Sequence, residues 1–331
     1  MIRLYTQTEN GISRIEEPKD HDYERSGVFW IDLLQPTAEE LRTVERQYAI
    51  EMPTKDEMRE IEATSRLYCE DGGRFMTACV LSRVETDEPE IAEITFILKG
   101  KQLITIRHTD TSTFHTFPTS LMRSPSPFNR DLVFVGLLEA LVDRQADVLE
   151  RFGTDLDAIS KKIFRAHHRR TAKNEEDPDT DDLREALEEL GRVGDLIGRQ
   201  RDALVTLLRL ISYGGCETKC TDPHETLYKA LHPATRDVQS LSEYASFLSN
   251  KINFMLDAVL GLINIEQNEI FKIFTILSLV FLPPTLIASI FGMNFASMPL
   301  LQSGWGFWIS IALMVCAAVL PLVIFKIKRY I

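Results

Sequence analysis

Polar residues stand within or beside a long apolar run near the C-terminus. The run from Phe271 to Gly292 contains Ser278 and Thr285, and Asn294 follows it. Hydroxyl and amide oxygens suit hard cations, or the water molecules that such cations hold. Because polar groups in a bilayer must be satisfied by protein or water, a pore formed by several copies is one explanation. The other is that the hydroxyls hydrogen-bond to their own helix.

One helical face connects these positions with others toward the N-terminus. Its members recur at helical spacing: Asp257, Gly261, Asn264, Asn268, Phe271, Phe274 or Thr275, Ser278, Leu282 and Thr285. In a ring of copies, Asn268 and Asp257 would form polar rings at the cytoplasmic mouth. Phe271, Phe274 and Leu282 would form hydrophobic constrictions that gate by dewetting. These three side chains could instead belong to the core of a helix bundle.

Two apolar segments are long enough to cross a bilayer. They cover residues 271–292 and 304–325, each 22 residues long, against about 20 needed for a spanning helix. Residues 326–331 are basic, Lys272 opens the first segment, and the connecting loop 293–303 has no charge. The positive-inside rule therefore predicts a hairpin with both feet, and both chain termini, in the cytoplasm.

The charges of the 331 residues are unevenly distributed. No Asp or Glu follows Glu269, and the four charges after it are basic, which leaves 33 basic and 49 acidic residues before it. An acidic body joined to an apolar tail excludes a purely soluble enzyme and a mostly embedded carrier. It also disfavours a nucleic-acid partner, which would need a basic face.

A long helix is expected to join the body to the membrane. From Pro233 to Gly292 only the pair Pro283-Pro284 interrupts helical sequence, and residues 233–270 would form a cytoplasmic stalk. Apolar residues along it are spaced alternately by three and four, which is a heptad seam: Val238, Leu241, Ala245, Leu248, Ile252, Met255, Val259 and Leu262. The seam could pack identical copies together, or pack against the body's own helices.

The body is predicted to contain two parts. Residues 1–128 combine strand-like segments at 2–7, 28–33, 74–84, 91–100 and 102–109 with helices after Thr37 and over 55–63, which indicates an α/β domain. Residues 129–232 are helical, with helices over 131–164 and 183–210 forming a hairpin. The predicted class is therefore an α+β membrane protein with a cytoplasmic α/β domain, a helical stalk and two C-terminal spans.

Two clusters in the helical part have competing interpretations. Nine acids lie at the hairpin tip between residues 175 and 189, and they form either a solvated tip or a sink for divalent cations. Cys216, Cys220 and His224 invite a zinc site, but the spacing is unusual and a local fourth ligand is missing.

The segment GLINIEQNEIFKIFTILSLVFLPPTLIASIFGMNF, residues 261–295, resembles the first span of the proteobacterial CorA divalent-cation channels, with Gly292-Met293-Asn294 as their signature. The resemblance implies a homopentameric funnel in the bacterial inner membrane that admits Mg²⁺, with Co²⁺ and Ni²⁺ as possible passengers, and that internal Mg²⁺ closes. It implies no enzyme activity and no cofactor. It also implies that Asn294 binds the hydrated ion near the Gly292 carbonyl, that Thr285 and Asn268 form polar rings, and that Leu282, Phe271 and Phe274 form the constriction.

This sequence departs from the family pattern in its external loop. The loop reads Met298-Pro299-Leu300-Leu301, without the acid that the family often has at position 300. Electrostatic attraction of cations to the outer mouth should then be weaker. The carboxylates that sense Mg²⁺ in the family are not evident here, and Asp237 and Glu243 are the candidates on the stalk.

Two other functions compete with a Mg²⁺ channel. A zinc transporter of the related ZntB branch is favoured slightly by Cys216, Cys220, His224 and His232, whereas the Pro-Pro pair favours CorA. A membrane-anchored sensor or enzyme is the third possibility, but no catalytic triad, phosphate loop or dinucleotide-binding glycine pattern is present.

Overall fold

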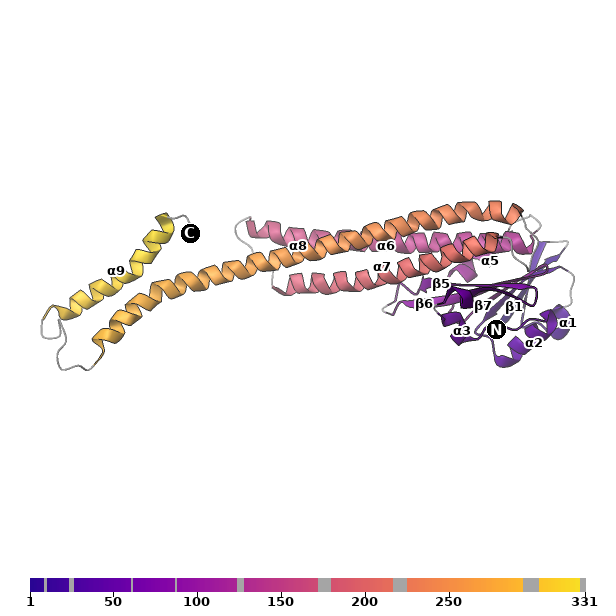
Figure 1. Ribbon diagram of the computed structural model, residues 1–331, viewed down its shortest axis with the longest axis horizontal. Coiled ribbons are helices and arrows are strands. Elements are labelled where there is room, and N and C mark those ends of the chain that lie inside the picture. Colours follow the sequence, from indigo (N-terminus) through magenta and orange to yellow (C-terminus); the bar gives the residue numbers. More distant parts are fainter. Residues whose placement is uncertain are drawn as a thin grey trace. The chain divides into compact units, whose positions relative to one another are not determined.

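The computed structural model describes residues 1–8, 11–23, 27–60, 62–86, 88–123, 128–171, 180–216, 225–293 and 304–327. The chain divides into two compact units, Met1–Leu256 and Asp257–Ile331. The first unit combines a sheet with helices on both faces, and the second holds the apolar helices (Figure 1).

A seven-stranded sheet organises the first unit. Its strands are β1 (Ile2–Thr8), β2 (Gly11–Glu16), β3 (Val28–Leu34), β4 (Leu67–Glu70), β5 (Gly73–Ser82), β6 (Glu90–Lys99) and β7 (Gln102–Arg107). The order across the sheet is β2-β1-β3-β7-β6-β5-β4. Only β3 and β7 pair in parallel, and every other neighbouring pair is antiparallel.

One face of the sheet is covered by short helices: α1 (Asp20–Tyr23), α2 (Ala38–Tyr48) and α3 (Lys55–Arg59), with α4 (Ala63–Arg66) leading into β4. The predicted start of α2 is confirmed, since Thr37 and Glu40 form a reciprocal capping box. Val44 of α2 and Met58 of α3 pack into a core with Leu33 and Ile104 of the central strands. Strand alternation sends the intervening side chains to the other face.

The other face is covered by α5 (Thr113–Arg123) and by two long helices, α6 (Arg130–Thr171) and α7 (Thr180–Gly215) (Figure 1). A buried ion pair lies on this face, where Arg107 of β7 donates to Asp32 of β3 at 2.8 Å. Arg107 also donates to Asp110 at 2.8 Å. Burial alone would lower the pKa of Arg107, but the charges of Asp32 and Asp110 raise it. The pair thus joins the two parallel strands at the centre of the sheet.

Helix α8 (Glu225–Phe291) is continuous over 67 residues, and α9 (Gly306–Ile327) follows it. The first part of α8 lies beside α6 and α7 (Figure 1). Lys251 pairs with Asp157 of α6 at 2.5 Å. A Cβ added to Gly153 of α6 would meet the Tyr244 hydroxyl at 2.5 Å, so the glycine permits this close approach. The three helices therefore form a bundle within one chain.

The heptad seam on the stalk is buried by the chain's own helices. Val238, Ala245, Leu248, Ile252 and Met255 are all at most 6% exposed in the single chain. A Cβ on Gly194 of α7 would lie 3.8 Å from Ile252. The seam was expected either to pack identical copies together or to pack against the body's own helices. In the first unit it packs against the body's own helices.

Several predicted boundaries were wrong. Helix α8 begins at Glu225, eight residues before Pro233, because proline inside a helix loses one hydrogen bond but does not always end it. The helix expected over 55–63 ends at Arg59, and α4 is separate. Strands β2 and β4 and helix α5 were missed. Both strands are short edge strands, and α5 contains Pro118.

We expect Asp32→Asn to lower the free energy of unfolding by about 3–5 kcal/mol, because Arg107 would remain buried without its main carboxylate. Urea unfolding of the detergent-solubilised protein, followed by Trp30 fluorescence, measures this. Glu85→Gln is the control. Glu85 is 67% exposed in its pair with Arg144, and such pairs add little. Equal unfolding midpoints for the two variants would contradict the assignment.

Candidate functional site

The residues of α8 that were predicted to line the ion path belong to the second unit. Asp257, Asn268 and Thr285 are exposed, as are Phe271 (68%), Phe274 (63%) and Leu282 (67%). At about 100° per residue, Asp257, Asn268, Phe271 and Leu282 fall within about 60° of one another around the helix. Phe274 and Thr285 lie at one border of this stripe. The helix therefore brings most of the predicted residues onto one face.

Thr285 hydrogen-bonds to its own helix, as the simpler of the two explanations expected. Its Oγ1 donates to the Phe281 carbonyl at 2.7 Å, and Thr275 donates to Phe271 in the same way at 2.7 Å. This bond uses the only hydroxyl proton, so Thr285 presents acceptor lone pairs alone to its surroundings. Water molecules bound to a cation are hydrogen-bond donors. Because its proton is used in this bond, the Thr285 hydroxyl oxygen can accept a hydrogen bond from the water of a hydrated cation.

Pro283 and Pro284 change the backbone chemistry next to Thr285. Neither residue has an N–H group, so the carbonyls of Leu279 and Val280, four residues earlier, lack their usual helical donors. Contrary to the interruption considered from the sequence, α8 passes through both prolines and ends at Phe291. In a bilayer, such carbonyls require water or protein donors. The pair therefore adds oxygen acceptors near the polar stripe.

The C-terminal end of α8 stands immediately before the Gly292-Met293-Asn294 motif. The Gly292 N–H donates to Ala288 at 2.9 Å, and the Met293 N–H donates to Ile290 at 3.3 Å. A helix C-terminus carries a partial negative charge, which favours a cation. Asn294 and the loop to residue 303 lie outside the described residues, so the placement of the amide stays a prediction.

Apolar side chains cover the outside of both predicted spans. An apolar stretch within α8, and α9 as a whole, are long and apolar enough to cross a membrane, with mean hydropathies of 2.1 and 2.6. Almost none of this surface is buried in the single chain, at 0% and 6%. Core helices of a soluble protein would be mostly buried, so lipid or other copies must cover these faces.

The charges of two other carboxylates act on Glu139 in the first unit. Partial burial, followed by the charges of Asp143 and Asp237, raises the pKa of Glu139 on α6. Asp237 was predicted from the sequence, whereas Glu139 and Asp143 were missed, although their spacing of four residues places both on one face of α6. Glu243 lies six residues beyond Asp237, on a different face of α8. The structure therefore associates Asp237, but not Glu243, with other acids.

The zinc and acidic-tip hypotheses receive little support. Cys216 is exposed after the end of α7 and His232 is exposed on α8, while Cys220 and His224 lie outside the described residues. Within the described ranges, no three His, Cys, Asp or Glu side chains gather as a metal site requires. Residues 175–179 of the acidic tip are also outside these ranges, and Glu189 pairs with Lys162 at 2.9 Å.

Comparison with known sequences covers the whole chain. A model of the family described as CorA-like Mg²⁺ transporter protein matches residues 25–329. The magnesium transport protein CorA of Haemophilus influenzae is 30% identical over 334 residues, and that of Escherichia coli K12 is 29% identical over 331 residues. In both cases all of this chain and all of the relative are covered.

Comparison with solved structures agrees on the fold. The complete CorA magnesium transporter of Methanocaldococcus jannaschii aligns with a TM-score of 0.77 and 18% identity, over 98% of this chain and 97% of that one. The ZntB cytoplasmic domain of Vibrio parahaemolyticus aligns less well, with a TM-score of 0.54 and 12% identity, over 79% of this chain and 97% of that one. The α/β domain, the long helices and the two apolar C-terminal helices are thus those of a known architecture, and the chain belongs to the CorA-like Mg²⁺ transporter family.

Proposed function

We propose that this protein carries Mg²⁺ across a membrane through a pore formed by several identical copies. The observation that carries the proposal is the exposed stripe of α8, which alternates polar and apolar side chains and leads to Gly292-Met293-Asn294. Membership of the CorA-like Mg²⁺ transporter family supports the choice of ion. The protein acts as a transporter and not as an enzyme, and Mg²⁺ is its cargo.

Assembly follows from geometry, since two helices from one chain cannot enclose an aqueous path. Five copies, the number implied by the family resemblance, would place α8 around the axis and α9 outside it. The basic residues at 326–331 and Lys272 favour cytoplasmic ends for both helices. We therefore place the protein in the bacterial inner membrane with both termini inside.

Selection would rest on the water shell of the ion. Mg²⁺ releases its bound water reluctantly, so a ring of Asn294 amides could accept hydrogen bonds from that water without stripping it. Thr285, whose proton is held by Phe281, would offer a second ring of acceptors, with Asn268 and Asp257 nearer the cytoplasm. Co²⁺ and Ni²⁺, and less readily Zn²⁺, could pass through the same rings.

Movement of the ion would be driven by voltage and stopped by apolar constrictions. A divalent ion gains about 4.6 kcal/mol per 100 mV of inside-negative potential. Leu282, Phe274 and Phe271 would form rings narrow enough to exclude water in the closed state. Opening would require neighbouring copies to move apart.

Internal Mg²⁺ would hold the copies together in the closed state. Partial burial, and then the charges of Asp143 and Asp237, raise the pKa of Glu139, and a cation bound beside these carboxylates would relieve the unfavourable part due to charge. Because these carboxylates do not close around a metal within one chain, the remaining ligands would come from a neighbouring copy. Loss of internal Mg²⁺ would then shift the population toward the open state.

We expect Asn294→Ala to reduce Mg²⁺ flux into proteoliposomes by more than about tenfold, because each copy loses a hydrogen bond to the hydrated ion. Gln302→Ala, in the same uncharged loop, is the matched control and should leave flux near the wild-type value. Size-exclusion chromatography verifies that both variants assemble normally. Undiminished flux through assembled Asn294→Ala would refute the proposed ion site.

We expect Leu282→Ser to raise Mg²⁺ flux several-fold at high internal Mg²⁺, because a polar ring would hydrate the constriction. Leu277→Ser introduces the same change about 140° away around α8, outside the stripe, and should keep flux low. Fluorescent Mg²⁺ indicators inside vesicles report both rates. A similar rise in the two variants would indicate general loosening of the helices rather than a gate at Leu282.

We expect the double variant Glu139→Gln, Asp237→Asn to need about ten times more internal Mg²⁺ for closure, since two negative charges of the proposed sensor are lost. Patch-clamp recording at stepped internal Mg²⁺ gives the half-closing concentration. Glu243→Gln removes a charge from another face of α8 and should leave this value unchanged. An unshifted double variant would exclude these carboxylates as the sensor.

A further inference from the structure

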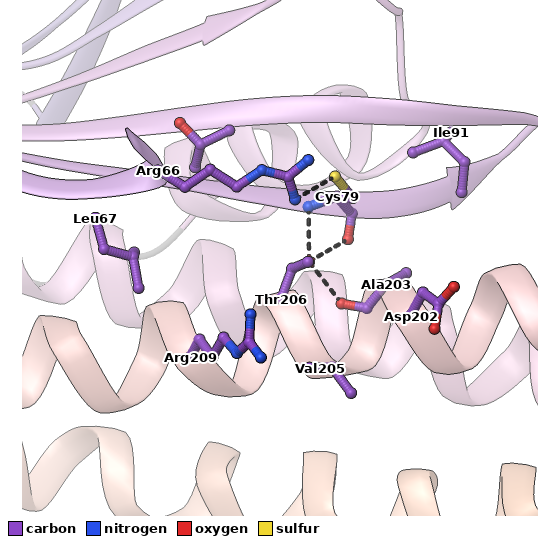
Figure 2. Close-up of a pocket in the computed structure, with 10 residues that line it drawn as sticks. Arg66, Leu67, Cys79, Ile91, Asp202, Ala203, Val205, Thr206 and Arg209 are labelled. Atoms are coloured by element: carbon purple, nitrogen blue, oxygen red, sulfur yellow. Dashed lines mark hydrogen bonds between the residues drawn. The ribbon is translucent and has the colours of Figure 1, made fainter. Parts of the chain in front are cut away.

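A cavity of about 450 Å³ lies within the first unit, between the sheet and α7, and none of its lining residues belongs to the proposed ion path. Its lining comes from the sheet, its edge and α7, and includes Arg66, Cys79, Asp202, Thr206 and Arg209 (Figure 2). Its size falls in the range of about 300–1,000 Å³ typical of small-molecule sites. Nothing in the proposed transport mechanism uses it.

The cavity exists because the edge strand of the sheet is short. Strand β4 pairs with β5 only as far as Leu67 opposite Met76, so β5 has a free edge beyond that point. At this edge the Cys79 N–H donates to Thr206 Oγ1 of α7 at 2.8 Å, and the same Oγ1 lies 3.2 Å from the Cys79 carbonyl. Thr206 Oγ1 thus accepts from the Cys79 N–H, and its single proton lies within reach of the carbonyls of both Ala203 and Cys79, at 2.8 and 3.2 Å. This contact ties α7 to the edge of β5 beside the cavity.

The guanidinium groups of Arg66 and Arg209 lie at one end of the cavity. Arg66 donates to the carbonyls of Arg59 and Glu60 and to the Cys79 sulfur, which leaves two of its five N–H donors. The nearby Glu93 pairs with Arg59, at 3.4 Å, and not with Arg66. Among the described residues, neither Arg66 nor Arg209 has a carboxylate partner within 4.0 Å. This end of the cavity thus carries two arginine charges, of which Arg66 is held in place by its hydrogen bonds and Arg209 is exposed.

The other end of the cavity has a different character. Asp202 precedes Arg209 by seven residues on α7, which separates them by about 10 Å along the helix. Figure 2 shows Asp202 on α7 and Ile91 on the sheet at the same end of the cavity, with Arg66 toward the other end. Leu67, Ala203 and Val205 supply apolar parts of the cavity wall. A bound ligand would therefore contact the positive charges of Arg66 and Arg209 at one end, apolar side chains along the wall, and the hydrogen-bond acceptor Asp202 at the other end.

We propose that this cavity binds a small amphipathic anion: a phosphate or carboxylate on a planar apolar body, with a hydrogen-bond donor about 10 Å away. Arg209 and the free N–H groups of Arg66 bind the anionic group, since guanidinium favours such oxygens. Leu67, Ile91 and Val205 contact the body, and Asp202 accepts from the donor. Burial raises the pKa of the Cys79 thiol, so Cys79 packs against the ligand as an unreactive thiol. The bound anion fastens α7 to the edge of β5.

The test uses the full-length protein in lipid nanodiscs and isothermal titration calorimetry at fixed Mg²⁺. Adenosine monophosphate probes the phosphate source, indole-3-acetate probes the carboxylate source, and inorganic phosphate probes charge alone. Empty nanodiscs correct for partition into lipid. We expect one organic anion per subunit, bound at least about tenfold more tightly than inorganic phosphate, together with a rise in the unfolding temperature.

The decisive variant is Arg209→Met, because Arg209 is exposed and makes no ion pair in the described part of the chain, so its loss should not disturb folding. It should weaken binding by at least about tenfold, and Arg66→Met should do the same where it folds. Arg192→Met, an exposed position on α7 outside the cavity, is the matched control. The proposal is overturned if neither organic anion binds saturably below about 1 mM, if inorganic phosphate binds as tightly, or if the Arg209 and Arg192 variants weaken binding equally.

Discussion

One continuous helix, α8, needs protein partners along its first part and apolar surroundings along its last part. Most features of this protein follow from that constraint. The first part of α8 buries Val238, Leu248 and Met255 against helices of its own chain. Its last part leaves Phe271, Phe274 and Leu282 between 63% and 68% exposed. No packing within one chain covers those side chains, and no acid follows Glu269 to make the surface compatible with water. Lipid and neighbouring copies have to complete the structure.

The use of the heptad seam within the chain limits how copies can meet. A stalk that packed its seam between copies would leave α6 and α7 without their apolar partner. With the seam occupied, the α8 surface available to a neighbour is the one that carries Phe247 and Phe254, which are 58% and 64% exposed and seven residues apart. Asp237 lies on α8 facing acids of α6. In the proposed assembly, contacts between copies would therefore involve a different face of α8 from the one that carries the heptad seam.

The sequence predicted the elements that are governed by local or periodic patterns. The long amphipathic helices, the two spans, the capping box at Thr37 and Glu40, and five of the strands follow from such patterns. Strand β4 pairs with β5 alone, so its formation depends on a partner that a local pattern does not reveal. The association of Glu139 with Asp237 spans almost one hundred residues, and only the packing of α6 against α8 could reveal it. The cavity beside Thr206 likewise depends on where β4 ends, which is a property of pairing and not of residue type.

The distribution of charge suggests how ions reach and leave the proposed pore. In the proposed orientation the external loop 293–303 carries no charge, whereas the part of the chain before the spans carries a net −16. Attraction at the outer mouth then depends on the C-terminal dipoles of the α8 copies, which converge there and which act only over about one helical turn. Such a short-range field suits an ion that keeps its water shell, because it orients the bound water without competing for the metal. In the proposed pore, the acidic cytoplasmic side would lower the electrostatic energy of an ion after it passes Leu282, so that capture outside would be weak and release to the inside would be favoured.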